Sequence, residues 1–267
     1  MTTVNDKQRS GHGLGDGVAA PVALAIAVTL LVAGSAPARA ESTQVEPAFA
    51  VLVFSRTAGY RHGSISAGIA AVRALGEQHR FRVDASENAG VFADERLARY
   101  RAVIFLNTTG DILDAGEQAA FERFIQRGGG FVGLHSATDT EYEWPWYQRL
   151  VGTYFRSHPV IQPATLHVVD STHLSTRELP AVWTRTDEWY NFRFDPSQDV
   201  SVLMRIDEAT YVGGNMGASH PMAWYHQFDG GRAWYTALGH TIQSYSEPLF
   251  LAHILGGIRW AAGVTGE

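Results

Sequence analysis

The sequence predicts an α/β fold with a mostly parallel central sheet. Between residues 49 and 134, four short apolar runs alternate with segments whose apolar residues recur at helical spacing. This alternation is typical of right-handed βαβ units, which place parallel strands side by side. The clearest unit is Gly128–Thr138, where glycines precede the apolar run Phe131–Leu134 and small polar residues follow it. That run is too short for a helix and is predicted to be a buried strand.

The first half of the chain supplies the strands and helices of this sheet. Strands are predicted at Phe49–Phe54, Phe81–Val83, Ala102–Leu106 and Phe131–Leu134. Continuous apolar runs of this kind predict strands that are buried on both faces. A helix is predicted from Ser64, which can cap it. A second helix is predicted after Asp114, which forms a capping-box pattern with Glu117.

After residue 138 the pattern changes to strands separated by turns, as an elaboration of the same domain. Strands are predicted at 165–169, 200–206, 222–228 and 232–238. Asp229-Gly230-Gly231 joins the last two strands, and this composition predicts a β-hairpin. Trp144–Tyr147 is predicted to be an aromatic loop. A final helix is predicted from Ser246, with Pro248 in its first turn.

Residues 1–40 have the pattern of a secretory signal peptide. Lys7 and Arg9 precede an uncharged run at 18–34, and Ala38-Arg39-Ala40 fits a cleavage site. A single membrane anchor is the alternative, but a run of about 17 residues is marginal for crossing a bilayer. We therefore expect cleavage, no membrane attachment afterwards, and a secreted or periplasmic location in a bacterium.

The remaining chain suits a flexible mature N-terminus at 41–48 and a single domain at 49–263. The leader carries a net charge of +1, so the net charge of −6 for the whole chain becomes −7 without it. Such a charge argues against nucleic acid and anionic membranes as partners. The sequence leaves the oligomeric state open.

Two residue types that often carry catalysis are missing from the predicted mature chain. The sequence has no cysteine, and its one lysine, Lys7, lies in the leader. Disulfides, thiol nucleophiles, Schiff bases and phosphate-loop lysines are therefore excluded from the mature chain. No Gly-x-Gly-x-x-Gly motif follows the first predicted strand, so neither a nicotinamide nor a flavin cofactor is expected.

Six segments carry a resemblance to a known family. They are Gly59–Ile65, Gly129–His135, His158-Pro159, Asp187–Tyr190, His220–Trp224 and Gly239–Thr241. Their order is similar to that in the ThuA-like family, named for trehalose utilisation, over residues from about 49 to 263. The resemblance implies a flavodoxin-like fold, as in class I glutamine amidotransferases, with helices on both faces of the sheet. It also implies a role beside sugar oxidation and keto-sugar breakdown, without supplying a mechanism.

The resemblance also bears on the nucleophile. Amidotransferases of this fold place a catalytic cysteine at a strand-to-helix elbow, and His135 takes that position here. Thiol-dependent amidotransfer is therefore excluded. Ser136 is a neighbouring hydroxyl, but serine hydrolases place the serine at the elbow itself.

Histidines and carboxylates are the candidate catalytic residues. His62, His135 and His240 are predicted at the carboxyl edge of the sheet, where open α/β sheets bind ligands. Histidine serves there as an acid or base, or as a neutral metal ligand. Asp187 and Glu188, which the sequence does not separate, complete the catalytic set. The metal is unknown: zinc or another divalent ion would find its ligands in His135, His240 and Glu188, whose spacing is not diagnostic.

The candidate residues for binding a small carbohydrate are mostly aromatic, because sugar rings stack on flat aromatic faces. They are Arg61, Trp144, Trp146, Tyr147, Trp189, Tyr190 and His220. Arg61 is included as a clamp for a hydroxyl or a carboxylate.

These observations favour an enzyme that processes a keto-sugar or glycoside by hydrolysis, elimination or isomerisation. All three reactions can share proton abstraction beside a carbonyl, with a histidine base and a metal ion or arginine to stabilise the enediolate. One alternative is a non-catalytic secreted carbohydrate-binding or accessory module, which needs the aromatics but not the histidines. A further alternative is an ester or amide hydrolase that uses Ser136.

Overall fold

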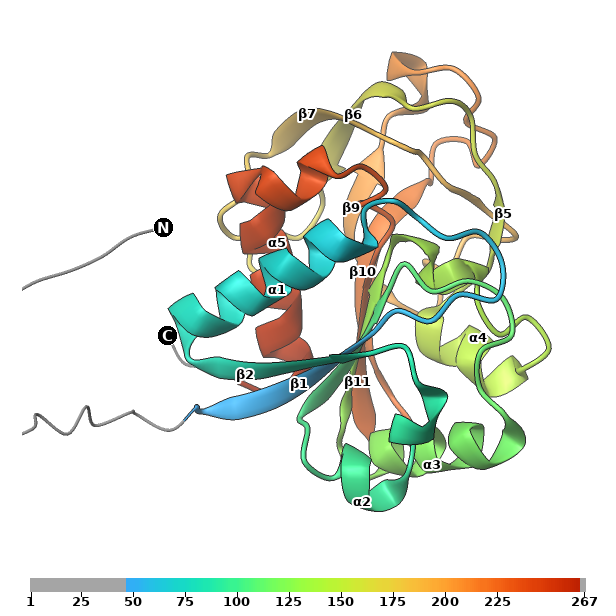
Figure 1. Ribbon diagram of the computed structural model, residues 1–267. Coiled ribbons are helices and arrows are strands. Elements are labelled where there is room, and N and C mark those ends of the chain that lie inside the picture. The colour runs from blue at the N-terminus through green and yellow to red at the C-terminus, as the bar shows by residue number, and fades with distance from the viewer. Residues whose placement is uncertain (1–46, 265–267) are drawn as a thin grey trace, which may run out of the picture. The chain divides into compact units, whose positions relative to one another are not determined.

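A nine-stranded mixed sheet forms the centre of the described part of the chain (Figure 1). The structure is a computed structural model that describes residues 47–264. The strand order is β2-β1-β3-β4-β11-β10-β9-β6-β7. The strands are β1 (Phe49–Phe54), β2 (Phe81–Ser86), β3 (Ala102–Leu106), β4 (Gly130–Leu134), β6 (Gln162–Val168), β7 (Val182–Asp187), β9 (Ser201–Ile206), β10 (Pro221–Phe228) and β11 (Gly231–Thr236). β5 (Phe155–Ser157) and β8 (Asn191–Phe192) pair separately.

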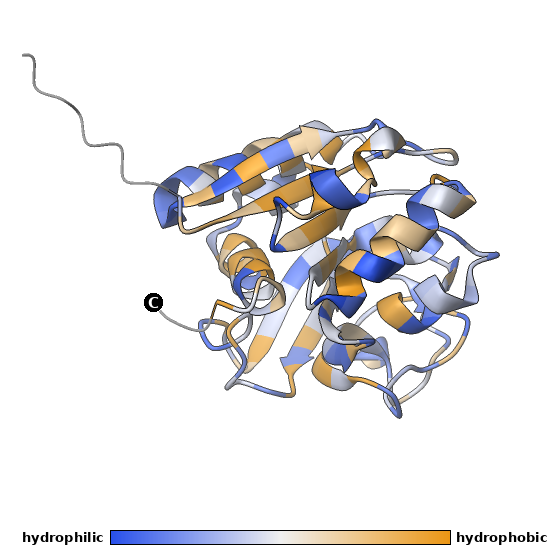
Figure 2. Cartoon of the chain, turned by 90° about the horizontal axis from the view of Figure 1, so that it is seen from below, coloured by the Kyte–Doolittle hydropathy of each residue, from blue (hydrophilic) through white to orange (hydrophobic). Residues whose placement is uncertain are grey.

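Helices cover both faces of this sheet. They are α1 (Ile65–His79), α2 (Asp94–Leu97), α3 (Ala115–Gln126), α4 (Pro145–Val151) and α5 (Pro248–Ala261). α1 and α5 pack together on one side, and α2, α3 and α4 lie on the other (Figure 1). The strands between them carry the hydrophobic residues of the core (Figure 2). None of the helices within residues 47–264 is long and apolar enough to cross a membrane.

The parallel half of the sheet is the one that the sequence predicts. β2, β1, β3, β4 and β11 run parallel to one another. β3 and β4 are buried along their whole length, as expected for strands covered on both faces. The predicted fold class, a mostly parallel α/β sheet with a late hairpin, is confirmed.

The remaining strands extend the sheet in antiparallel fashion. The predicted hairpin is confirmed: β10 and β11 pair around Asp229 and Gly230, whose φ angles are 49° and 92°. Two successive positive φ angles match the type I′ turn that suits a two-residue hairpin loop. Four antiparallel pairings separate β11 from β7, and this even number makes β7 run in the direction of β4 and β11. The carboxyl end of β7 therefore faces the same edge as theirs.

Three local predictions can be compared with the structure. Asp114 and Glu117 form the predicted capping box at the start of α3. Ser64 precedes α1 but does not cap it, because its hydroxyl donates to the Gly239 carbonyl and accepts from Asn107. The aromatic loop predicted at 144–147 is wrong, since Pro145 begins α4 and fits the first helical position.

Part of the N-terminal organisation lies outside the described residues. The predicted signal peptide at 1–40 and residues 41–46 of the predicted flexible segment are not among residues 47–264. Ala48, the last residue of that predicted segment, donates its N–H to the carbonyl of Arg80 beside β2.

Glycine allows α5 to pack directly on β11. A Cβ added at Gly257 would lie 2.5 Å from the Trp234 ring, closer than any relaxed contact. Trp234 is fully buried, so its ring has no free space to enter.

We predict opposite effects for one substitution in two helices. Gly257→Ala should lower the free energy of unfolding by about 1–3 kcal/mol, because overpacking outweighs the gain in helix propensity. Gly116→Ala, in the exposed first turn of α3, should leave it unchanged or raise it by up to ~1 kcal/mol. Urea titrations measure the free energy of unfolding of both variants. Equal changes in the two variants would contradict the proposed packing.

Candidate functional site

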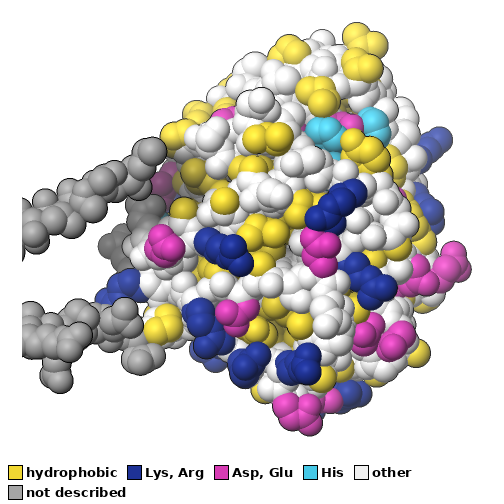
Figure 3. All heavy atoms as spheres, in the orientation of Figure 1, with side chains coloured by type: hydrophobic (Ala, Val, Ile, Leu, Met, Phe, Trp, Pro, Cys, Tyr) yellow, Lys and Arg dark blue, Asp and Glu magenta, His cyan; other side chains and the backbone are white. Residues whose placement is uncertain are grey.

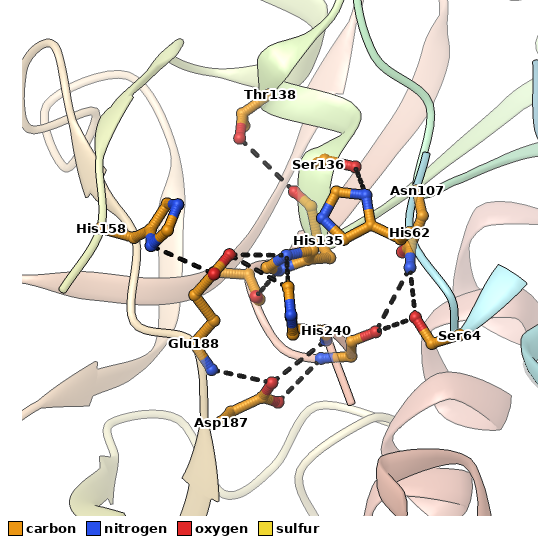
Figure 4. Close-up of polar contacts among 12 residues, drawn as sticks. His62, Ser64, Asn107, His135, Ser136, Thr138, His158, Asp187, Glu188 and His240 are labelled. Carbon is orange, nitrogen blue, oxygen red and sulfur yellow. Dashed lines mark hydrogen bonds and ion pairs between the residues drawn. The ribbon is translucent and has the colours of Figure 1, made fainter. Parts of the chain in front are cut away.

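Four side chains converge at the carboxyl edge of the sheet (Figure 4). His135 directly follows β4, Glu188 directly follows β7, and His240 lies in the loop after β11. His62 comes from the loop between β1 and α1. Each residue offers one nitrogen or oxygen atom, and these four atoms lie within 4.8 Å of one another. The structure thus brings together all three predicted histidines and one of the two predicted carboxylates.

Three of these atoms form a compact triangle. His240 Nδ1 lies 3.1 Å from Glu188 Oε2, and His135 Nε2 lies 3.2 Å from His240 Nδ1 and 3.4 Å from Glu188 Oε2. The ligands of a tetrahedral ion with bonds of about 2.1 Å are about 3.4 Å apart. The triangle therefore has nearly the dimensions of one face of such a coordination site.

The orientation of His135 is fixed by the backbone. Its φ of 50° is unusual for a residue other than glycine, and it turns the chain sharply from β4 into the short helix η2 (His135–Asp139). Its Nδ1 lies 2.8 Å from the carbonyl oxygen of Ala237. Because that oxygen only accepts, Nδ1 carries the hydrogen and Nε2 presents its lone pair to the triangle. Metal-binding histidines are commonly oriented by this kind of contact.

The protonation states suit a cation site. Burial, followed by repulsion from His135 and His240, lowers the pKa of His62 to about 3, so its imidazole stays neutral at pH 7. Burial alone would raise the pKa of Glu188, but the interactions with the neighbouring His135 and His240 imidazoles outweigh burial and hold this pKa well below its usual range. The site therefore combines a neutral His62 imidazole with an ionised carboxylate.

His158 is a site residue that the sequence analysis did not select. Its Nδ1 lies 3.1 Å from Glu188 Oε1, the oxygen that faces away from the triangle. Nearly half of the His158 side chain is exposed. The His158-Pro159 pair contributes to the family resemblance, but its loop gives no sign in the sequence that it reaches Glu188.

Asp187 has a different place from the one predicted. Oδ1 accepts the backbone N–H groups of Glu188 at 3.0 Å and His240 at 3.1 Å, and Oδ2 accepts that of Gly239 at 2.9 Å. The side chain is fully buried and pairs with the buried Arg185 at 3.3 Å. Because both oxygens are engaged away from the triangle, Asp187 positions the two loops that carry Glu188 and His240. The structure thereby separates the two neighbouring carboxylates.

A cavity of about 410 Å³ opens in front of the triangle. Its lining residues are Tyr60, His62, Asp139, Phe155, His158, Glu188, Tyr190 and His240. Tyr190, a predicted binding residue, packs against the His135 ring with 4.2 Å between ring centroids. Histidine side chains reach the surface here beside acidic and hydrophobic ones (Figure 3). The cavity therefore has aromatic walls and a polar floor.

Most of the other predicted binding residues do not face this cavity. Trp144, Trp146 and Tyr147 are buried, because α4 turns them toward the core, where they stack on one another. Their polar atoms are bonded internally: Trp144 donates to Glu122, Trp146 to Asp229 and Tyr147 to the Ala137 carbonyl. The prediction that these three residues form a sugar-stacking loop is wrong.

The last three predicted binding residues are also placed elsewhere. Arg61 forms an exposed ion pair with Glu87 at 2.7 Å. Trp189 is buried and donates to the carbonyl of Gln162. His220 is buried and lies 2.8 Å from the carbonyl of Tyr190, so it supports the cavity wall from behind. The Ser136 hydroxyl is likewise buried, 3.4 Å from His62 Nδ1, and does not line the cavity.

Comparisons with known proteins give the family. The sequence model of ThuA, described as trehalose utilisation, matches residues 50–261. The chain belongs to the ThuA family. The predicted resemblance is thus confirmed over nearly the whole of the described fold.

Solved structures support the same fold. A ThuA-like protein from Bacteroides uniformis is 22% identical with a TM-score of 0.69, and the match covers 85% of this chain and 95% of that one. A ThuA-like protein from Parabacteroides merdae is 21% identical with a TM-score of 0.69, covering 83% and 93%. At this identity the two structures show a shared fold. No match was found among curated proteins.

We predict that Asp187→Asn destabilises the fold and loosens the site. The asparagine amide would place its own N–H₂ group against backbone N–H groups, and it would remove the negative charge that pairs with Arg185. Together these effects should lower the free energy of unfolding by about 3 kcal/mol. The matched control is Asp84→Asn. Asp84 also pairs at 3.3 Å with an arginine two residues before it in a strand, Arg82, but that pair is exposed. The control should lose about 1 kcal/mol or less.

Urea unfolding of the two variants measures the difference. A loss at Asp187 no larger than that at Asp84 would contradict the positioning role.

Proposed function

We propose that this ThuA protein is a metal-dependent enzyme acting on a keto-sugar or keto-glycoside. The observation that carries the proposal is the convergence of His62, His135, Glu188 and His240 on one point in the wall of a cavity. The family description, trehalose utilisation, supports a carbohydrate substrate. The cavity volume lies within the usual range for small-molecule sites, and aromatic walls suit a sugar ring.

The chemistry of the donor atoms supports a divalent cation. Lone pairs on His135 Nε2 and Glu188 Oε2, only 3.4 Å apart, repel each other unless a positive charge lies between them. Without a metal, a proton on His240 Nδ1 can supply the positive charge that offsets this repulsion. A bound metal ion would replace that proton. Three imidazoles and one carboxylate are a ligand set that suits Zn²⁺ and similar ions.

The reaction follows from the acidity of carbon beside a carbonyl group. Removal of a proton from that carbon sends the C–H electron pair toward the carbonyl, whose oxygen becomes an enediolate oxygen. A bound divalent ion would supply the positive charge that stabilises this oxygen. With the carbonyl at C3 of a glycoside, the proton leaves C2 and the bond from C1 to the departing oxygen can then break. Return of the proton to a different atom without that cleavage gives isomerisation instead.

In this mechanism the chain's own residues hold and orient the substrate. Tyr60 and Phe155 offer faces on which the sugar ring packs, and the buried Tyr190 supports Phe155 from inside the protein. Glu188 remains ionised because its interactions with the His135 and His240 imidazoles lower its pKa, and His158 Nδ1 lies 3.1 Å from its second oxygen. The binding-module alternative needs exposed aromatic residues, and the burial of Trp144, Trp146 and Tyr147 removes three of the predicted ones.

Export is a further part of the proposal. The pattern of residues 1–40 supports cleavage after Ala40 and release into the periplasm or the medium. Mass measurement of the protein recovered from the periplasm and the medium tests it. A chain that retains residues 1–40 would contradict it.

We predict about one tightly bound Zn²⁺ per chain in the mature protein. His135→Ala combined with His240→Ala should weaken binding by at least ~100-fold, because two of the four ligands are lost. His167→Ala, at an exposed histidine outside the site, is the matched control and should leave binding unchanged. Calorimetric titration of chelator-treated protein measures the affinities. Equal affinities for the parent and the double variant would contradict the site.

We predict that the metal-loaded protein exchanges carbon-bound hydrogen in a keto-glycoside. The probe is the 3-keto derivative of methyl α-glucoside in D₂O, and magnetic resonance follows loss of the C2 proton signal and release of methanol. Chelation should abolish exchange, and Zn²⁺ should restore it. Binding of the probe without exchange or turnover, retained in the His135→Ala, His240→Ala double variant, would favour the non-catalytic binding module.

A further inference from the structure

A second carboxylate lines the cavity beside the metal-binding group. Asp139 ends the short helix η2 that begins at His135, and it shares the cavity lining with His62, Glu188 and His240. Its backbone is fixed, because its carbonyl accepts the N–H of Gly110 at 2.8 Å. Asp139 is not one of the four converging ligands.

The two oxygens of Asp139 have different surroundings. Oδ1 accepts a hydrogen bond of 2.6 Å from the Tyr142 hydroxyl. Oδ2 has no hydrogen-bond partner within residues 47–264 and is not among the buried polar atoms left without one. No described cation forms an ion pair with the carboxylate. Tyr142 thus orients the group through one oxygen and leaves the other available at the cavity.

The two carboxylates of the cavity also have different surroundings. Burial raises the pKa of Asp139, and the Tyr142 hydrogen bond only partly opposes this effect. Glu188 instead lies within 3.1–3.4 Å of nitrogens of His135, His158 and His240. In many active sites a pair of carboxylates with such different environments divides the roles, one remaining charged and the other exchanging protons.

If the histidines bind the metal, another residue must act as the base that removes the proton from the substrate. A nitrogen whose lone pair faces a metal ion cannot also accept a proton from the substrate. His135 Nε2 and His240 Nδ1 both belong to the triangle, and the other nitrogen of His135 donates to Ala237. The histidine base expected from the sequence is therefore incompatible with these nitrogens if they bind the metal.

We propose that Asp139 is the catalytic residue that transfers the proton, an assignment that rests on the proposed function. Oδ2 takes the proton from C2 of the 3-keto-glycoside, and the C–H electron pair forms the C2–C3 double bond of the enediolate. The carbonyl π electrons move to the C3 oxygen. When the enediolate collapses, its electrons re-form the carbonyl, a double bond forms between C1 and C2, and the C1–O bond breaks. The proton passes from Asp139 to the departing oxygen, so atoms and electrons balance.

Tyr142 is the positioning residue of this pair. Its hydroxyl lies 3.3 Å from the Phe155 carbonyl as well as 2.6 Å from Asp139, and the guanidinium of Arg193 packs 4.2 Å from the centre of its ring. These contacts hold the hydroxyl where it meets Oδ1. Loss of the hydroxyl should therefore reduce the rate less than loss of the carboxylate.

The test compares Asp139→Asn with the parent in the keto-glycoside assay. Asparagine keeps the shape and can still accept from Tyr142, but it cannot take the proton. We expect turnover and C2 exchange to fall by about 10²–10⁴-fold. KM should stay within a few-fold of the parent, and Zn²⁺ stoichiometry should stay at about one per chain. Tyr142→Phe should give a smaller loss, and the exposed control Asp199→Asn should give none.

Each outcome has a defined meaning. Turnover and exchange at the parental rate in Asp139→Asn would overturn the Asp139 assignment while the proposed function stands. Loss of Zn²⁺ from Asp139→Asn would also overturn it, because the residue would then serve to hold the metal site. Absence of exchange in the Zn²⁺-loaded parent would overturn the proposed function together with the assignment.

Discussion

The buried carboxylate of Asp187 connects the two loops on which the site depends. It accepts backbone N–H groups from Glu188 on one side and from Gly239 and His240 on the other. β7 and β11 are separated in the sheet by three other strands, so strand pairing alone does not hold their ends together. Burial makes each of these hydrogen bonds to a charged group strong, and Arg185 supplies the counter-charge. The positions of Glu188 and His240 follow from this one carboxylate.

The site that results concentrates unlike groups in a small volume. Lone pairs and charges that would repel one another in isolation are held 3.1–3.4 Å apart by the sheet edge, by the Ala237 carbonyl and by Asp187. Such an arrangement persists only if a cation or proton offsets the repulsion, or if the stability of the surrounding fold outweighs its unfavourable free energy. The left-handed backbone of His135 is one sign of the second contribution. A ready-made ligand set of this kind suits an ion that is held tightly.

The sequence predicts the part of the site that depends on the ends of strands. His135 and His240 follow segments that the sequence predicts as strands, and His62 lies in the loop after another, so their meeting at one edge is predictable. Asp187 and Glu188 could not be separated, because β7 combines buried Arg185 and Asp187 with exposed positions and has no apolar pattern. The aromatic residues of α4 were misplaced because Trp-Pro-Trp-Tyr has the composition of a loop, whereas the helix buries their rings. His158 depends on a long-range contact that no local pattern encodes.

Anomalous diffraction at the zinc absorption edge tests the central claim most directly. Crystals of the protein grown with Zn²⁺ would be measured on both sides of the edge. We predict one strong peak at about 2.0–2.2 Å from His135 Nε2, His240 Nδ1 and Glu188 Oε2. A map with no peak within bonding distance of these atoms, or with zinc bound only elsewhere, would contradict the account.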